Sequence, residues 1–124
     1  MTRAGRVVGL LQKALDSSPG DVYSLEDVKD AIETGRAQVF ARGESILITE
    51  ILIGSLGKIM AIWLAAGDIE DIAELEQIAC DAARKFGCKK AVFNGRRGWT
   101  KHWLPRQAGW RPQHVGFVKD LSGA

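Results

Sequence analysis

The chain has 124 residues, a formal net charge of +2 and 46% hydrophobic residues. This length and composition are typical of a soluble globular protein and predict one domain over residues 1–124. The small net charge excludes a nucleic-acid binder that acts through its overall charge, so such a partner would have to contact a locally basic segment.

The N-terminal part of the chain predicts two short helices. Apolar residues recur at helical spacing from Val7 to Leu15, and Ser17-Ser-Pro-Gly-Asp21 ends that helix. Ser24, with Asp27 three residues later, has the pattern of a helix N-cap and opens a second helix that ends at Gly35. We expect the two helices to pair as a hairpin. The first apolar run is too short for a signal peptide or a membrane span, so no membrane partner is expected.

The middle of the chain changes to the pattern of β-strands. Three runs rich in β-branched and apolar residues are separated by tight, glycine-containing turns. They predict three antiparallel strands over Gln38–Ala41, Ser45–Ile53 and Lys58–Leu64.

A long amphipathic helix is predicted from Asp68 to Phe86, ended by Gly87. Its apolar face is expected to comprise Ile72, Leu75, Ala79, Ala82 and Phe86, and its polar face Glu70, Glu74, Asp81 and Arg84. The rest of the chain predicts a strand over Lys90–Asn94, a brief helix over Thr100–Ala108 and a last strand over Gln113–Val118. The order is then α-α-β-β-β-α-β-α-β, which predicts an α/β protein with a mixed sheet, the long helix joining two parallel strands.

Charge is strongly segregated along this sequence. Asp68 to Asp81 contains six carboxylates and no cation, whereas Lys89 to Lys119 contains eight Lys or Arg residues and no carboxylate. The acidic face of one copy could therefore dock against the basic face of the next and form a head-to-tail assembly.

Metal or disulfide chemistry is not indicated. Cys80 and Cys88 lie eight residues apart, without a CxxC spacing or neighbouring histidines, which favours two buried free thiols. His102 and His114 have no acidic or Cys residue nearby in the sequence and are interpreted as ordinary polar residues.

From about Val7 to Leu121 the chain resembles the GNAT acyltransferase superfamily. The resemblance rests on the element order, on a long helix that ends in Lys85-Phe-Gly-Cys88, and on Gln107-Ala-Gly-Trp110 before the final strand. It implies a loop after the fourth strand of the family fold, Gln/Arg-x-x-Gly-x-Gly/Ala, whose amides hold the coenzyme A diphosphate. It also implies a tyrosine general acid four residues before a Gly-Phe pair near the end.

Both functional features of the family are altered in this sequence. The loop Leu64-Ala-Ala-Gly-Asp-Ile-Glu-Asp71 has one glycine, Gly67, and no preceding Gln or Arg, and the tyrosine position is Pro105. Asp68, Glu70 and Asp71 would stabilise the start of the helix through its dipole, and they would also repel a diphosphate. If the chain is an active acetyltransferase, the backbone amides of Ala66 and Gly67 would bind acetyl-CoA.

Glu50 is the candidate general base for that alternative. It shares strand parity with Ile46, Ile48 and Leu52, so it could point into the inner surface of the sheet and take a proton from an amine. The structural alternatives are pairing with Arg96 or Arg97, or a place on a solvent-exposed face.

A narrower resemblance connects the chain to short GNAT-like proteins of tailed bacteriophages. It rests on Thr49-Glu50-Ile51, Gly95-Arg-Arg-Gly-Trp99 and Gly109-Trp110. It implies a non-catalytic structural or assembly component of a virion, found in the particle and in the host cytoplasm, whose partners are other virion proteins or further copies of the same chain.

The basic C-terminal segment is the candidate surface for such protein contacts. Arg and Trp are enriched at interface hot spots, and this segment combines both. The alternatives are nucleic-acid binding and ordinary core packing of the tryptophans. The predicted partner-contact residues are Arg96, Arg97, Trp99, Trp103, Arg106, Trp110 and Arg111.

Overall fold

The computed structural model describes residues 8–9, 11–12, 15, 23–93, 109–111, 119 and 121. The chain divides into two compact units, Met1–Phe93 and Asn94–Ala124, and each is treated by itself. The prediction of one domain over residues 1–124 stays a prediction. The helix predicted over Thr100–Ala108 and the strand predicted over Gln113–Val118 lie wholly outside the described residues.

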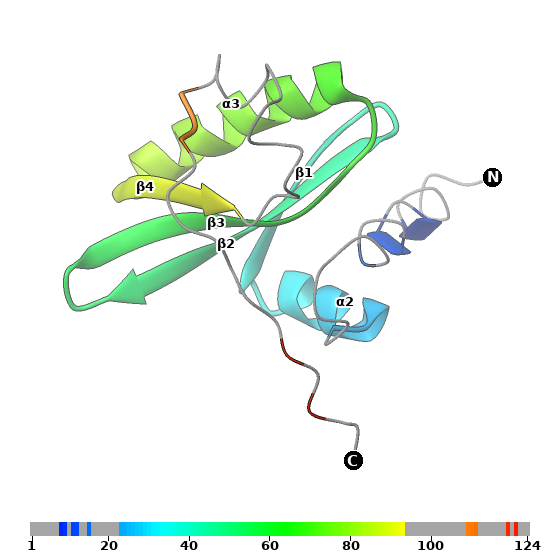
Figure 1. Ribbon diagram of the computed structural model, residues 1–124, viewed down its shortest axis with the longest axis horizontal. Coiled ribbons are helices and arrows are strands. Elements are labelled where there is room, and N and C mark those ends of the chain that lie inside the picture. Colours follow the sequence, from blue (N-terminus) through cyan, green and yellow to red (C-terminus); the bar gives the residue numbers. More distant parts are fainter. Residues whose placement is uncertain are drawn as a thin grey trace. The chain divides into compact units, whose positions relative to one another are not determined.

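The first unit contains a four-stranded mixed sheet in the order β1-β2-β3-β4. Its strands are β1 (Ala37–Arg42), β2 (Ser45–Gly54), β3 (Gly57–Ala66) and β4 (Cys88–Phe93). The pairs β1–β2 and β2–β3 are antiparallel, whereas β3 and β4 are parallel, as the sequence predicted. Helix α3 (Ile69–Lys85) provides the crossover between β3 and β4 (Figure 1).

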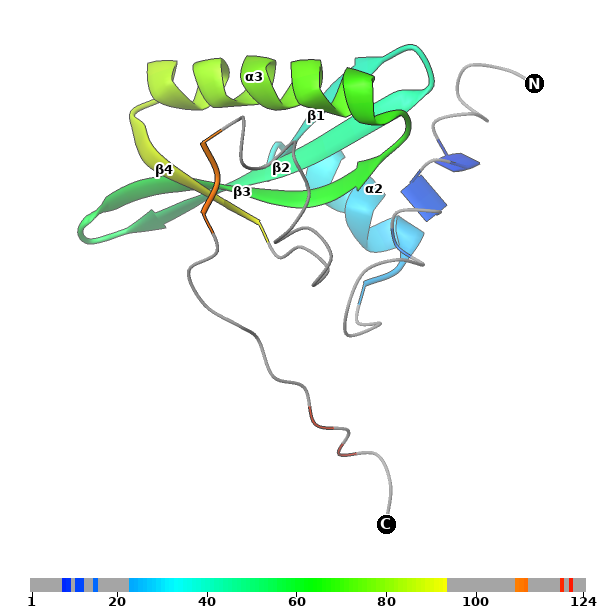
Figure 2. The same cartoon turned by 45° about the horizontal axis from the view of Figure 1, so that its top comes forward.

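Helices cover both faces of the sheet, with α3 on one face and α2 (Leu25–Glu33) on the other, as Figure 2 shows. Residues in β2 therefore alternate between two cores: Ile46 and Ile48 face α2, and Leu47 faces α3. Because both faces are covered, the first half of β2 is buried throughout.

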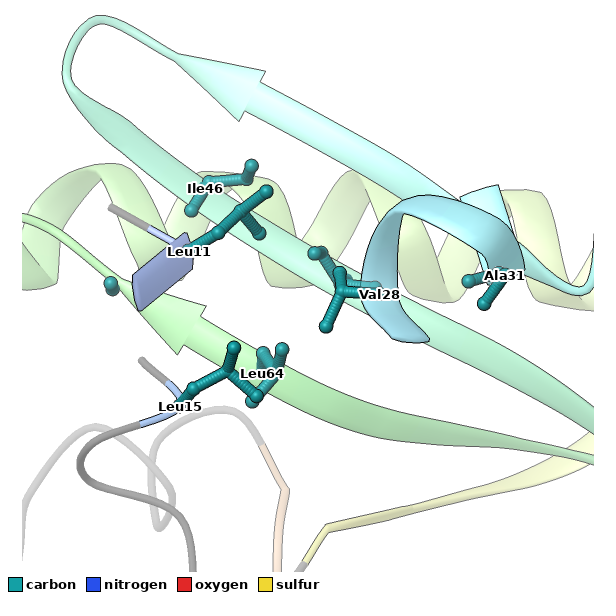
Figure 3. Close-up of a cluster of buried hydrophobic side chains, with 9 residues drawn as sticks. Leu11, Leu15, Val28, Ala31, Ile46 and Leu64 are labelled. Atoms are coloured by element: carbon teal, nitrogen blue, oxygen red, sulfur yellow. The ribbon is translucent and has the colours of Figure 1, made fainter. Parts of the chain in front are cut away.

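The core on the α2 side combines both N-terminal helical segments with the sheet. Val8, Gly9, Leu11, Gln12 and Leu15 are helical, in agreement with the first predicted helix. Leu11 and Leu15 lie in one buried cluster with Val28 and Ala31 of α2 and with Ile46 and Leu64 of the sheet (Figure 3). Ser24 and Asp27 form the predicted capping box at the start of α2.

A register shift interrupts the pairing of β2 with β3. Ile48 lies opposite Leu64 while Thr49 lies opposite Ile62, so Trp63 is the extra residue of a β-bulge. Trp63 packs beside the α2-side core together with Leu64, and its ring meets Tyr23 edge-on with centroids 5.1 Å apart.

The apolar face of α3 differs from the prediction in its last turns. Leu75, Ala79 and Ala83 are the buried positions, because they follow one another at four-residue spacing along the helix. Ala82 and Phe86, which were predicted to be on this face, are exposed. The predicted polar face of Glu70, Glu74, Asp81 and Arg84 is confirmed as exposed.

Candidate functional site

A polar network ties the start of α3 to the strands β1 and β2. The Ser45 hydroxyl donates a hydrogen bond to Asp71 Oδ2 at 3.0 Å and accepts one from the backbone N–H of Asp68 at 2.9 Å. Arg42 lies with Nε 3.5 Å from Asp71 Oδ1 and also pairs with Glu74. Because Ser45 is fully buried, this network fixes the acidic helix start against the sheet.

Gly67 joins β3 to α3 where the loop approaches Ser45 closely. Its φ is +126°, and a Cβ at this position would lie 2.2 Å from Ser45 Oγ and 2.5 Å from Ser45 Cα. A side chain here would collide with a buried residue in a conformation that L-residues rarely adopt. Gly67 therefore has a structural role, and Ala66 beside it is a buried residue that pairs with Ile46.

A coenzyme A diphosphate at this helix start would need accessible amides in neutral or basic surroundings. One amide, that of Asp68, already donates to Ser45. Asp68 is at the predicted N-cap position, but its side chain makes no capping hydrogen bond. With Glu70, Asp71 and Glu74 it places four carboxylates in the first two turns, two of which pair with Arg42. This residue set does not fit a bound diphosphate.

Glu50 lies far from that helix start. It is half-buried in β2 between Ala37 of β1 and Ala61 of β3, on the sheet face that carries Ile48. Ser45 is five residues away along the strand, which corresponds to about 17 Å. Within the described parts of the chain, no hydrogen bond or ion pair involves the Glu50 carboxylate, and its proposed partners Arg96 and Arg97 lie outside those parts.

An apolar groove of about 180 Å³ lies at the other end of α3. It opens between the last turns of the helix and the adjacent face of β1 and β2. Thr49 donates a hydrogen bond to Gln38 Oε1 at its base, and the Lys58 ammonium lies 4.4 Å from the centre of the Phe86 ring at its rim. The lining residues are Gln38, Phe40, Thr49, Ile51, Met60, Ala79, Ala82, Ala83 and Phe86.

The surroundings of the Cys80 thiol disfavour its reactive thiolate form. Burial raises the pKa of this thiol from 9.0 to about 12, with a further contribution from its hydrogen bond to Glu76 Oε1 at 3.2 Å. It is therefore protonated at neutral pH. Cys80 and Cys88 are both free, as predicted, but they are half-buried and not buried.

The predicted partner-contact segment is largely outside the described residues. Arg96, Arg97, Trp99, Trp103 and Arg106 cannot be placed on a surface for that reason, and their role stays a prediction. In the second unit, Trp110 is half-buried and Arg111 is exposed, following Gly109 with a φ of +87°.

The described residues contain neither a metal site nor a membrane-spanning helix. No group of three or more His, Cys, Asp or Glu side chains there could hold a metal ion. Nor is any helix in those ranges both long enough and apolar enough to cross a membrane.

Sequence reasoning did not find the roles of Ser45 and Arg42. Ser45 is 26 residues from Asp71 along the chain, and the contact forms only when the β1–β2 turn meets the start of α3. The one local signal was the Arg42-Gly-Glu44 turn before the strand, which predicts a bend but no partner.

Solved acetyltransferases share this structure over nearly their whole length. An acetyltransferase from Trypanosoma brucei matches with a TM-score of 0.68 at 14% identity, covering 94% of this chain and 92% of that chain. Glucosamine-6-phosphate N-acetyltransferase from Arabidopsis thaliana matches with a TM-score of 0.67 at 10% identity, covering 98% and 95%. Ribosomal-protein-alanine N-acetyltransferase from Brucella melitensis biovar Abortus 2308 matches with a TM-score of 0.66 at 15% identity, covering 95% and 93%.

By sequence, no family model and no curated protein matches the chain. Identities of 10–15% establish similarity of fold but not of activity. The mixed sheet, the parallel β3–β4 pair and the crossover helix are shared with those enzymes. The chain has the GNAT acetyltransferase fold.

Proposed function

We propose that the protein acts without catalysis, as a structural or assembly component of a tailed-bacteriophage particle. It would work through protein–protein contacts with other virion proteins or with copies of itself, in the virion and in the cytoplasm of the host. The observation that carries the non-catalytic part is the carboxylate network at the start of α3. In a fold whose solved examples are acetyltransferases, that position is occupied here by the protein's own anionic groups.

Carboxylates at the start of α3 oppose the binding of a diphosphate there. A helix start attracts anions through its free amides and its dipole, and like charges placed there remove that attraction. Asp71 is fixed by Ser45 and Arg42, so its carboxylate cannot swing away without breaking a buried hydrogen bond. The exposed Asp68 and Glu70 add two further negative charges beside it.

The assignment to a phage particle is supported by sequence motifs alone. Thr49-Glu50-Ile51 lies in β2. Gly109-Trp110 lies in the second unit. The basic segment that contains Arg96, Arg97 and Trp99 would supply the contacts, and nucleic acid is a less favoured partner.

Thermal unfolding with and without acetyl-CoA tests the proposal that the protein acts without catalysis. The concentration is 1 mM, on the order of 100 times an ordinary dissociation constant. A ligand at that excess adds roughly 2.7 kcal/mol to stability and raises the midpoint by several degrees. We expect no rise for the native chain. A clear rise would contradict the proposal.

Two double variants test whether negative charge at the start of α3 is what prevents acetyl-CoA from binding. Asp68→Asn with Glu70→Gln removes two exposed charges at the start of α3 without touching Ser45 or Arg42. Asp30→Asn with Glu33→Gln removes two exposed charges from α2 as a matched control. We expect acetyl-CoA to raise the midpoint of the first variant only. If neither variant responds, charge repulsion is the wrong explanation.

Mass spectrometry of purified virions tests the particle assignment, using a phage that encodes this chain. We expect the chain at a fixed ratio to the major capsid protein. If it is missing from both mature particles and assembly intermediates, the structural role is wrong.

The second candidate is an acetyl-CoA-dependent N-acetyltransferase with an altered cofactor loop. It is favoured by the solved relatives in fold, which are named as acetyltransferases and match over almost the entire chain. In that case Glu50 would be the base and Ala66 and Gly67 would contact the cofactor. A midpoint rise with acetyl-CoA in the native chain would make this the leading candidate.

A further inference from the structure

We draw no further inference here: the strongest candidate, the apolar groove between the last turns of α3 and the adjacent face of β1 and β2, carries no proposal because nothing in the structure shows what covers it.

Discussion

The two halves of β2 have similar sequences and opposite environments. Ser45–Thr49 is buried at every position, whereas Ile53 in the second half is largely exposed. The first half lies between β1 and β3, with α2 on one face and α3 on the other. The second half stays paired with β3 but extends past the end of β1. Burial of an apolar strand is therefore decided by the elements around it and not by its own hydrophobicity.

The two halves also differ in what lies beside them. The covered half begins at Ser45, which is hydrogen-bonded to the acidic start of α3. The uncovered half lies beside the apolar groove, which Ile51 lines. One end of β2 thus meets an acidic, hydrogen-bonded helix start, and the other end is exposed and apolar.

The largest expected effect comes from truncating one isoleucine in each half. Ile48→Ala removes a side chain with no solvent exposure and should lower the free energy of unfolding by about 4 kcal/mol, through lost burial and the cavity left behind. Ile53→Ala, the matched change in the exposed half, should alter it by less than about 0.5 kcal/mol. Urea denaturation measures both. Equal losses would show that the second half is covered after all.

Gly67→Ala should have the next largest effect. The new Cβ would collide with Ser45 and the positive φ would be strained, so we expect a loss of about 3 kcal/mol. Gly35→Ala is the control, because Gly35 also has a positive φ, of 80°, but open space around it. Its loss should be about 1 kcal/mol. A similar loss for both variants would mean that the contact with Ser45 does not limit position 67.

Cys80 reports the covering of the first half by α3 without changing stability at neutral pH. In a Cys88→Ser background, alkylation at pH 8 should be about a hundredfold or more slower in the folded chain than in urea, because the folded pKa is about 12 instead of 9.0. Since the folded pKa is raised, this thiol's contribution to stability is complete below pH 9.0 and is lost as the pH rises towards about 12. Rapid alkylation of the folded chain would show that α3 does not stay packed on the sheet.

Much of the fold followed from local pattern. The capping residues Ser24 and Asp27 located α2, the period-two runs located three strands, and Asp68 marked the start of α3. The predicted apolar face was wrong by one position in the last turns of α3, because the apolar spacing allowed either Ala82 or Ala83 to face the sheet. The site was less predictable, because Ser45 and Asp71 are neighbours only in the folded chain.

The sequence by itself determined the type and order of the elements, because capping, periodicity and turn residues act within a few positions of one another. Only the tertiary structure decided that Ser45 holds Asp71 and Asp68, and that Ile48 is buried while Ile53 is not. The physical reason is that covering and pairing are supplied by elements distant in sequence. How far β1 and α3 extend along β2 sets where burial of that strand ends.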